Sequence, residues 1–597
     1  MTNPTTPFSW QMPTATDLVT DLPADFEVFG QAVATSMADL LGGTTGQILA
    51  KASNTNMDFT WITNDVGDIT AVTATTPLTG GGTSGAITVG IQDGTTAQKG
   101  AVQLTDSTST TSSTLAATAT AVKTAYDLAA AGAPTTQLQA LPTRVPAGEQ
   151  IMSQAVWWID CAQIDRADQV LDNQGWGGST LTTQLGSTIT ADSNDPKYLA
   201  WSGENYLYLP GVASNYASAA DSAALSITGD IDIRCKVAPD QWLEGSWLIT
   251  KSASTADAYS FSRGATGLLS LTWTNAAGTV TSKNSTASYS FTDGTTQWLR
   301  VTLDVDNGAS GNDVKFFTST DGTNWTQLGA TVTTAGTTDI RDTVAPLYVG
   351  VYRGTDGPFS GKFYRAQVFN GINGTMVFDA NFTDIASGAD VNLYANTGQL
   401  VTINRSTTGK KAAAVVYPLW LFGTDDYMEV ADNSLIDFGA TDSFTLFAVG
   451  RQWSTFGTND AILAKKADTT ATTAGYLLGD DGTTAALARM QSGDGTAGTS
   501  TTSGSSRTSG TLYTITGVRN VATDDTIVYL NSTAGTAVTD TTTTTLANAE
   551  VLRLGRLSGA GTEYNDMELV AAAIFTRALS ATEITTLYNY YLGRIGG

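Results

Sequence analysis

An internal repeat in the C-terminal two-thirds of the chain constrains its fold more than any other feature. The segment WSGENYLYLPG, which begins at Trp201, parallels LFGTDDYMEVAD, which begins at Leu421. Four further pairs of segments follow in the same order, among them RVTLDVDNG and TITGVRNVA. The copies lie roughly 200 residues apart, whereas the repeats of a solenoid run ~20–50 residues. The repeat therefore predicts two tandem domains of the same fold.

Each copy consists of short alternating strands, with turn signals about every ten residues. Phe444, Leu446 and Ala448 alternate with Thr445, Phe447 and Val449, so this strand is apolar on both faces and is expected to be central. Asp321-Gly322 is a hairpin turn signal between two such runs. Only 14% of the residues are charged, while the chain holds 60 glycines. This pattern predicts an antiparallel β-sandwich in each copy.

The end of the chain carries a helix signal. Ser580 and Glu583 form a capping box, and an apolar face runs from Ile584 to Tyr591. A closing helix of this kind after Arg577 resembles the laminin-G/concanavalin A-like family, and the segments FGTDDYMEV and WSGENYLYL resemble the strand that opens that fold. The resemblance implies two lectin-like jelly-roll domains, which we expect at residues 151–390 and 391–597.

A short amphipathic helix is predicted near the start, between Asp25 and Leu41. Its apolar positions recur at three- and four-residue steps and form one stripe. They are Phe26, Phe29, Val33, Met37 and Leu40. So short a helix cannot bury this stripe alone, and self-association into a bundle is the simplest solution. The alternative is that the helix packs on its own domain.

The segment TTAQKGAVQLTDSTSTTSSTLAATATAVKTAYDLAA, residues 95–130, combines a strand, a Ser/Thr loop and a helix. Its spacing of Gly100, Val102–Leu104, Leu115–Thr118 and Ala125–Asp127 resembles the phage tail-fibre repeat. The preceding Gly46–Leu49 and Asp58–Trp61 resemble a hairpin that is common in such fibres. Val122 and Tyr126 form a second small stripe, which is too small for an independent core. Apolar stripes this small are stable when several copies share them, and the resemblance to tail fibres implies three copies. We therefore expect a homotrimer.

The whole chain is thus expected to be mainly β. An extended trimeric N-terminal stalk with short helices precedes two tandem antiparallel sandwiches. We assign residues 1–45 to a virion-attachment segment and helix, 46–130 to the stalk with its fibre repeat, and the proline-containing residues 131–150 to a linker. The N-terminus is expected to contact other phage tail or baseplate proteins.

Charge and composition narrow the function. The net charge of −25 repels phosphate backbones, so we expect no nucleic-acid partner. No apolar run approaches the ~20 residues that span a bilayer, so membrane insertion is not expected. The first residues lack the features of a signal peptide, which fits a virion protein made in the host cytoplasm. The chain has no histidine, which excludes Ser-His-Asp triads and His-ligated zinc. Cys161 and Cys235 are read as buried thiols, with a disulfide as the alternative.

Sugar binding needs flat aromatic faces and planar polar groups. In the first copy, these could come from the tryptophans and from a rim loop, and the alternative is that the tryptophans belong to the core. The candidates are Trp242, Trp247, Trp273, Tyr352 and Arg353.

Calcium, which the laminin-G resemblance makes a candidate cofactor, requires six to eight oxygen ligands. Carboxylates that could supply them are Asp230 and Asp232 in the first copy and Asp425 and Asp426 in the second. No EF-hand spacing supports them, and aspartates at strand-end turns are the alternative.

Three functions remain in view. The first is a tail fibre or minor tail protein that binds host cell-surface polysaccharide during adsorption. The second is a structural tail or capsid-decoration protein whose sandwiches contact other virion proteins. The third is a polysaccharide depolymerase, which needs two carboxylates ~5–9 Å apart. Because no Glu-x-Asp-x-x-Glu run appears in the sequence, we expect no enzymatic activity.

Overall fold

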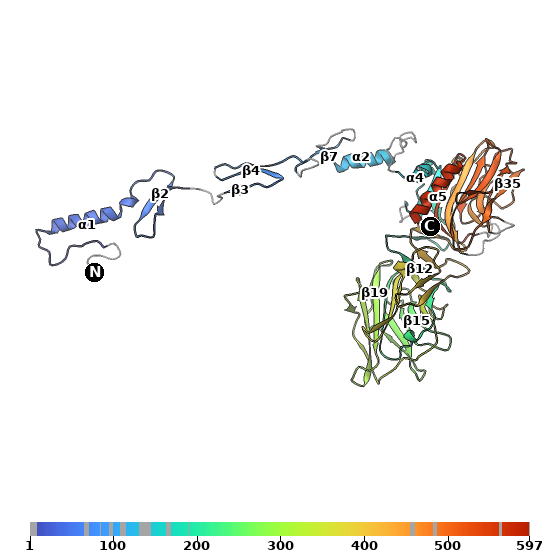
Figure 1. The fold of residues 1–597 in the computed structure, drawn as a ribbon, viewed down its shortest axis with the longest axis horizontal. Coiled ribbons are helices and arrows are strands. Elements are labelled where there is room, and N and C mark those ends of the chain that lie inside the picture. The colour runs from blue at the N-terminus through green and yellow to red at the C-terminus, as the bar shows by residue number, and fades with distance from the viewer. Residues whose placement is uncertain are drawn as a thin grey trace. The chain divides into compact units, whose positions relative to one another are not determined.

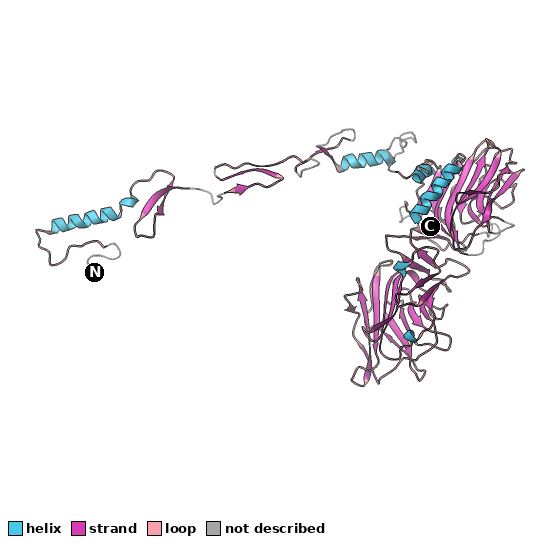
Figure 2. Ribbon diagram, in the orientation of Figure 1, coloured by secondary structure: helices cyan, strands magenta, loops and turns pink. Residues whose placement is uncertain are grey.

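A computed structural model describes most of the chain in two compact units, residues 1–134 and 135–597. The described residues are 9–64, 71–83, 85–94, 100–107, 115–130, 145–162, 169–188, 190–453, 460–481, 486–559 and 564–595. Strands dominate (Figure 2), and the sheets of the second unit are antiparallel, so the mainly β fold class is confirmed. Within the described ranges, no helix has the length and apolar character needed to cross a membrane.

The first unit begins with a helix and a hairpin. The helix α1 (Leu22–Ser36) starts three residues earlier and ends sooner than the sequence predicts, and a 3-10 turn (Ala38–Leu40) follows it. Pro23 lies in its first turn, where a missing backbone N–H costs nothing. The predicted hairpin is confirmed, because β1 (Gln47–Lys51) pairs antiparallel with β2 (Phe59–Thr63).

Short strands and a capped helix complete this unit. β4 (Leu78–Gly82) pairs with both β3 (Val72–Thr73) and β5 (Val89–Ile91). β6 (Gln103–Thr105) pairs in parallel with β7 (Leu115–Ala117), which leads directly into α2 (Ala119–Ala130). The Thr118 hydroxyl accepts a bond of 3.1 Å from the Ala121 N–H, as expected of an N-cap.

Two β-sandwiches make up the second unit (Figure 1). One, here called the inserted sandwich, spans residues 206–415, and the other is called the C-terminal sandwich. The strands of the inserted sandwich are β12 (Tyr206–Pro210), β13 (Tyr216–Ala219), β14 (Ile231–Pro239), β15 (Ser246–Lys251), β16 (Tyr259–Arg263), β17 (Leu269–Thr274), β18 (Val280–Asn284), β19 (Gln297–Asp304), β20 (Gly311–Ser319), β21 (Thr326–Gln327), β22 (Val332–Ala335), β23 (Leu347–Val349), β24 (Ser360–Asn370), β25 (Thr375–Asn381), β26 (Asn392–Tyr394), β27 (Leu400–Asn404) and β28 (Ala413–Val415).

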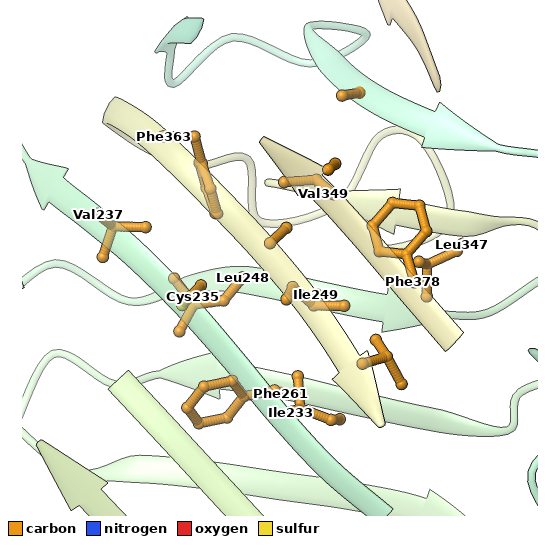
Figure 3. Packing of buried hydrophobic residues seen from close by; sticks show 14 of the residues in the cluster. Ile233, Cys235, Val237, Leu248, Ile249, Phe261, Leu347, Val349, Phe363 and Phe378 are labelled. Atoms are coloured by element: carbon orange, nitrogen blue, oxygen red, sulfur yellow. The ribbon is translucent and has the colours of Figure 1, made fainter. Parts of the chain in front are cut away.

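The inserted sandwich consists of two facing sheets. One sheet has the order β21-β20-β19-β14-β24-β12-β28, and the other has the order β18-β17-β16-β15-β23-β13-β27-β26. Side chains of β14, β15, β23 and β24 interdigitate between them (Figure 3), among them Ile233, Cys235, Leu248 and Phe363. Alternation along β14 explains this core, since its odd-numbered residues 231–237 are all fully buried apolar side chains.

The C-terminal sandwich draws strands from both sides of the inserted one. Its strands are β8 (Trp157–Asp160), β9 (Val170–Leu171), β10 (Thr183–Leu185), β11 (Lys197–Leu199), β29 (Leu419–Leu421), β30 (Met428–Val430), β31 (Phe444–Gln452), β32 (Ala461–Lys466), β33 (Gly475–Asp480), β34 (Leu487–Gly493), β35 (Gly498–Ser506), β36 (Leu512–Asn520), β37 (Asp525–Leu530), β38 (Thr533–Ala534), β39 (Val538–Thr539), β40 (Leu552–Leu554) and β41 (Met567–Phe575). One sheet runs β11-β29-β41-β31-β36-β37-β38, with β8 on β41, and the other runs β35-β34-β33-β32-β40-β30-β10-β9.

The two sandwiches are therefore nested, and the expectation of a tandem order is corrected. The chain leaves the C-terminal sandwich at Leu199 and returns at Leu419, and these two residues are cross-strand partners. It enters the inserted sandwich at β12 and leaves at β28, where Tyr206 pairs with Val415. In each sandwich, the strand before the crossing pairs antiparallel with the strand after it. The inserted sandwich therefore takes the place of the loop in a hairpin formed by β11 and β29.

The expected domain boundaries differ from this pairing at both ends. β8–β11 fall in the segment 151–390 but pair with the C-terminal sandwich, and β26–β28 fall in 391–597 but pair with the inserted one. The repeat located the segments that resemble each other. The repeat did not predict where the short strands β8–β11 and β26–β28 pair, because their pairing depends on contacts between segments far apart in the chain.

The closing helix packs on the outer face of a sheet. α5 (Ala581–Ile595) places Leu587, Tyr591 and Ile595 in a core with Phe447 of β31, and the rings of Phe447 and Tyr591 lie 5.6 Å apart. The short helix α4 (Ala147–Met152) joins the same core through Ile151 and Met152. The capping box is confirmed, since Ser580 N donates to Glu583 Oε2 at 2.9 Å and Glu583 N donates to Ser580 Oγ at 3.3 Å.

Candidate functional site

Three of the five predicted sugar-binding residues come together on the inserted sandwich. Trp247 of β15 stacks on Tyr352, with ring centroids 4.6 Å apart and planes at 21°. The Arg353 guanidinium lies 4.6 Å from the centre of the Tyr352 ring. Asp257, from the turn before β16, accepts from both the Tyr352 hydroxyl at 2.7 Å and Arg353 Nε at 3.2 Å. We call these four residues the rim cluster.

The loop after β23 is folded so that it presents this cluster. Tyr352 and Asp356 form an isolated β-bridge, which turns the chain back on itself. Arg353 has a φ of 55°, in the region that side chains rarely adopt. Gly357 also has a positive φ and lies against the indole, because a Cβ there would meet Trp247 Cδ1 at 2.7 Å. Only glycine fits at this position, so the sequence fixes how closely the loop approaches Trp247.

Burial and charge fix the ionisation of the cluster. Partial burial, together with the hydrogen bond to Asp257, raises the pKa of Tyr352 to about 12, so its hydroxyl stays protonated and donates. The hydrogen bond to Asp257 raises the pKa of Arg353 above its ordinary value. At neutral pH the cluster therefore holds one ion pair beside two aromatic rings, and its own charges cancel.

The rim cluster is partly open to solvent. Trp247, Asp257, Tyr352 and Arg353 are half-buried, and the side chain of Arg353 is 34% exposed. A rigid aromatic pair with a planar guanidinium at its edge combines apolar contact with directed hydrogen bonds. That combination is what recognition of a sugar ring requires.

Trp242 and Trp273 do not belong to this site, and their candidacy is corrected. They are 0% and 1% exposed and lie in the core of the inserted sandwich. The indole N–H of Trp242 donates to Thr295 O at 3.2 Å, and that of Trp273 donates to Thr338 Oγ1 at 3.1 Å. A ring enclosed on all sides cannot present a face to a ligand, so the alternative of core residues holds for these two.

The aspartates proposed for calcium in the first copy have other partners. Asp232 is fully buried and accepts bidentate bonds from Arg234 and Arg300, at 2.6–3.1 Å. Burial raises the pKa of Asp232, but the two guanidiniums outweigh this effect and lower the pKa overall. Asp230 accepts from the Val305 N–H at 2.8 Å, at the end of β19. At Asp232, the guanidiniums of Arg234 and Arg300 occupy the carboxylate lone pairs that a cation would need.

The second pair of aspartates gives no metal site either. Asp426 is buried, accepts from Lys410 Nζ at 2.7 Å and binds the Gly423 N–H at 2.5 Å, whereas Asp425 is exposed. Burial raises the pKa of Asp426 to about 6, which is opposite to the effect of a cation site. Across the described ranges, no group of three or more Asp, Glu or Cys residues could hold a metal.

The predicted oligomerisation residues lie in the first unit. No residue of α1 is buried, and Phe26 and Met37 are 58% and 43% exposed. Phe29, Val33 and Leu40 are half-buried, and Phe29 contacts Trp10 edge-on at 6.0 Å. Val122 is 59% exposed. Tyr126 lies in α2, and its side chain falls outside the described part of the chain.

Sequence reasoning missed Asp257, which ties Tyr352 to Arg353. It lies in the turn between β15 and β16, and no local pattern marks it as a partner of a loop some hundred residues later. The two cysteines are confirmed as free and buried thiols, one in each sandwich. Burial raises the pKa of both thiols.

Comparison with known proteins agrees with the sequence resemblance. Residues 95–136 match the phage tail fibre repeat family, which confirms the tail-fibre resemblance of this segment. No curated protein matches the chain.

Among solved structures, domains LG4–5 of the mouse laminin α1 chain are 12% identical, with a TM-score of 0.24, and the match covers 65% of this chain and 96% of that one. A SAP-like pentraxin from Limulus polyphemus is 11% identical, with a TM-score of 0.22, over 34% and 95%. The binding domain of Paraclostridial Mosquitocidal Protein 1 is 15% identical, with a TM-score of 0.25, over 32% of this chain. The match spans 47% of that chain, about half its length.

Proposed function

We propose that this chain is a fibre protein of a phage tail and that its inserted sandwich binds host cell-surface glycan during adsorption. The tail-fibre repeat at residues 95–136 supports a place in the virion tail. The rim cluster supports glycan binding, because it brings Trp247, Tyr352 and Arg353 together at a half-exposed edge. The cluster is the single observation that carries the second half of the proposal.

The proposed fibre is a homotrimer whose N-terminal segment contacts other tail or baseplate proteins. Ala121 is the only buried hydrophobic residue among the described residues of the first unit. Apolar side chains left in water by one copy become stabilising when several copies share them. Three copies would also present three rim clusters. Several linked sites raise the avidity for a repeating glycan even when the affinity of each site is unchanged.

Binding of the full chain to a glycan array and to host cells tests this function. We expect Trp247→Ala and Arg353→Ala to reduce binding to host polysaccharide about five- to thirtyfold, since each removes a contact surface worth ~1–2 kcal/mol. Trp176→Ala is the matched control, because this tryptophan is 51% exposed and lies in the C-terminal sandwich, away from the cluster.

Other outcomes identify the other functions. Array silence together with binding to purified virion proteins would support a structural tail or capsid-decoration role and reject glycan binding. Release of reducing ends from host polysaccharide would support a depolymerase and reject a purely binding fibre.

A further inference from the structure

A cavity, here called the junction cavity, lies between residues of the inserted sandwich and the outer face of the sheet that carries α5. Its volume is about 280 Å³. β31 and β36 form its floor, where Val449 pairs with Thr514 and Arg451 pairs with Leu512. All four side chains point to the same face, because cross-strand partners share a face.

Three further elements wall this junction cavity. Tyr588, Leu592 and Ile595 of α5 line one side at helical spacing, and Asn531, from the turn after β37, lines another. Ser387 and Ala389 of the inserted sandwich line the remaining side. The cavity therefore requires both sandwiches, and small-molecule sites occur preferentially at such domain interfaces. Ala389 and Leu592 are exposed, so the cavity is open to solvent on their side.

Two buried polar atoms of the floor lack partners. Thr514 is 4% exposed, and its hydroxyl has no hydrogen bond among the described residues. Arg451 is 3% exposed, and its Nε has none within the same ranges. A buried polar group without a partner costs ~1–3 kcal/mol, so a molecule that binds in the cavity and supplies the missing bonds would recover this cost.

The charge of the cavity selects a neutral occupant. Arg451 Nη1 donates to Glu568 Oε2 at 3.0 Å, so its charge is already compensated. Its Nη2 donates to the Tyr417 hydroxyl at 3.2 Å. An anionic ligand would therefore find no unpaired cation among the residues that line the cavity. The remaining lining is apolar or neutral, and a volume near the low end of the ~300–1,000 Å³ range suits a small ligand.

We propose that the junction cavity is a second glycan site, which holds a single neutral sugar ring between α5 and the β31–β36 floor. The ring's C–H face packs on Leu512, Leu592 and Tyr588, and its hydroxyls bond to Thr514 and Arg451 Nε. This inference extends the proposed function to a second site. Its role in adsorption rests on the proposed function, whereas sugar binding in the cavity does not. The rim cluster and the junction cavity share no residue.

Titration calorimetry and saturation-transfer NMR of the full chain test the proposal. The probes are N-acetyl-D-glucosamine, D-galactose and L-rhamnose, with D-galacturonate as the acidic comparison. We expect at least one neutral sugar to bind more tightly than D-galacturonate. Thr514→Val removes the hydroxyl and keeps the shape, so it should weaken that sugar about five- to tenfold. Ala389→Trp fills the opening and should abolish binding.

Thr516→Val is the matched control. Thr516 lies two residues along β36, on the same face, is 0% exposed and has an unpartnered hydroxyl, but it does not line the cavity. We expect Thr516→Val to leave binding of the neutral sugar unchanged. Equal losses for Thr514→Val and Thr516→Val, or preference for D-galacturonate, would overturn the inference.

The two proposals fail separately. If no neutral sugar binds the wild-type chain while the chain still binds host cells through Trp247, the junction site is rejected and the proposed function stands. If the sugar binds and Thr514→Val weakens it while host-cell binding is absent, the junction site stands and the adsorption role is rejected.

Discussion

At the scale of single residues, burial divides side chains of one type between two roles. Trp273 is enclosed in the core of the inserted sandwich, whereas Trp247 stacks on Tyr352 at a half-exposed edge. Removing a buried aromatic side chain leaves a cavity, whereas removing one at the rim leaves solvent. The same substitution should therefore have different effects on stability.

We predict that Trp273→Ala lowers the free energy of unfolding by ~3–5 kcal/mol and that Trp247→Ala lowers it by less than ~2 kcal/mol. Urea unfolding followed by circular dichroism measures both values. Equal losses would show that Trp247 is a structural residue, and would weaken the case for the rim cluster.

Glu583 gives a prediction with a definite pH window. Burial raises its pKa, but bonds from Arg577 and from the N–H and hydroxyl of Ser580 outweigh this and lower the pKa to about 2. A carboxyl group whose folded pKa is lowered stabilises the fold above its ordinary pKa of 4.5, and this stabilisation is lost as the pH falls from about 4.5 to 2. With the side chain 28% exposed, solvent screening reduces the effect.

We expect Glu583→Gln to lower the free energy of unfolding by ~1–2 kcal/mol at pH 7, and to have little effect at pH 2. Unfolding curves at both pH values measure the difference. Glu244→Gln serves as a control, because Glu244 is exposed. A loss for Glu583→Gln that is independent of pH would contradict this account of the capping box.

At the scale of elements, α1 and α5 show how the same amphipathic pattern has two outcomes. α5 buries Ile584, Leu587 and Tyr591 on the outer face of its own sheet. α1 has a comparable stripe, but no residue of it is buried within one copy. The two helices differ in their packing partners. The apolar face of α5 packs on a sheet of the same chain, whereas the stripe of α1 has no such sheet in the described part of its own copy.

We predict that Phe26→Ser dissociates the proposed trimer. Each copy would lose the burial of one phenylalanine side chain, worth ~1.5–3 kcal/mol. Light scattering should show the mass fall from three times 62.1 kDa towards 62.1 kDa. Val19→Ser, at a position 81% exposed and outside the helix, should leave the mass unchanged. A wild-type chain that is monomeric at micromolar concentration would reject the trimer.

At the scale of the whole molecule, the nested order of the sandwiches decides which parts fold alone. Leu199 and Leu419 are paired neighbours, so a short turn can join them without moving either strand. By contrast, a fragment that begins at residue 391 lacks β8–β11, which pair with β41, β30 and β29.

We predict that residues 135–597, with 200–418 replaced by Asn-Gly, unfold cooperatively in urea. The fragment 391–597 should be aggregated or unfolded, because it exposes the sheet positions that β8–β11 occupy. The reverse result, a cooperative 391–597 and an unfolded excised chain, would favour the tandem order over the nested one.

The sequence by itself determined the mainly β fold class, the two related sandwiches, the tail-fibre repeat and the capped closing helix. These features depend on local periodicity and on side chains close together in the chain, such as Ser580 and Glu583. Tertiary structure alone decided the nested order, the burial of Trp242 and Trp273, the pairing of Asp232 with two arginines and the joining of Asp257 to Arg353. Each of these depends on contacts between distant segments, and such contacts leave no local pattern because the fold, not the spacing in the chain, sets which residues meet.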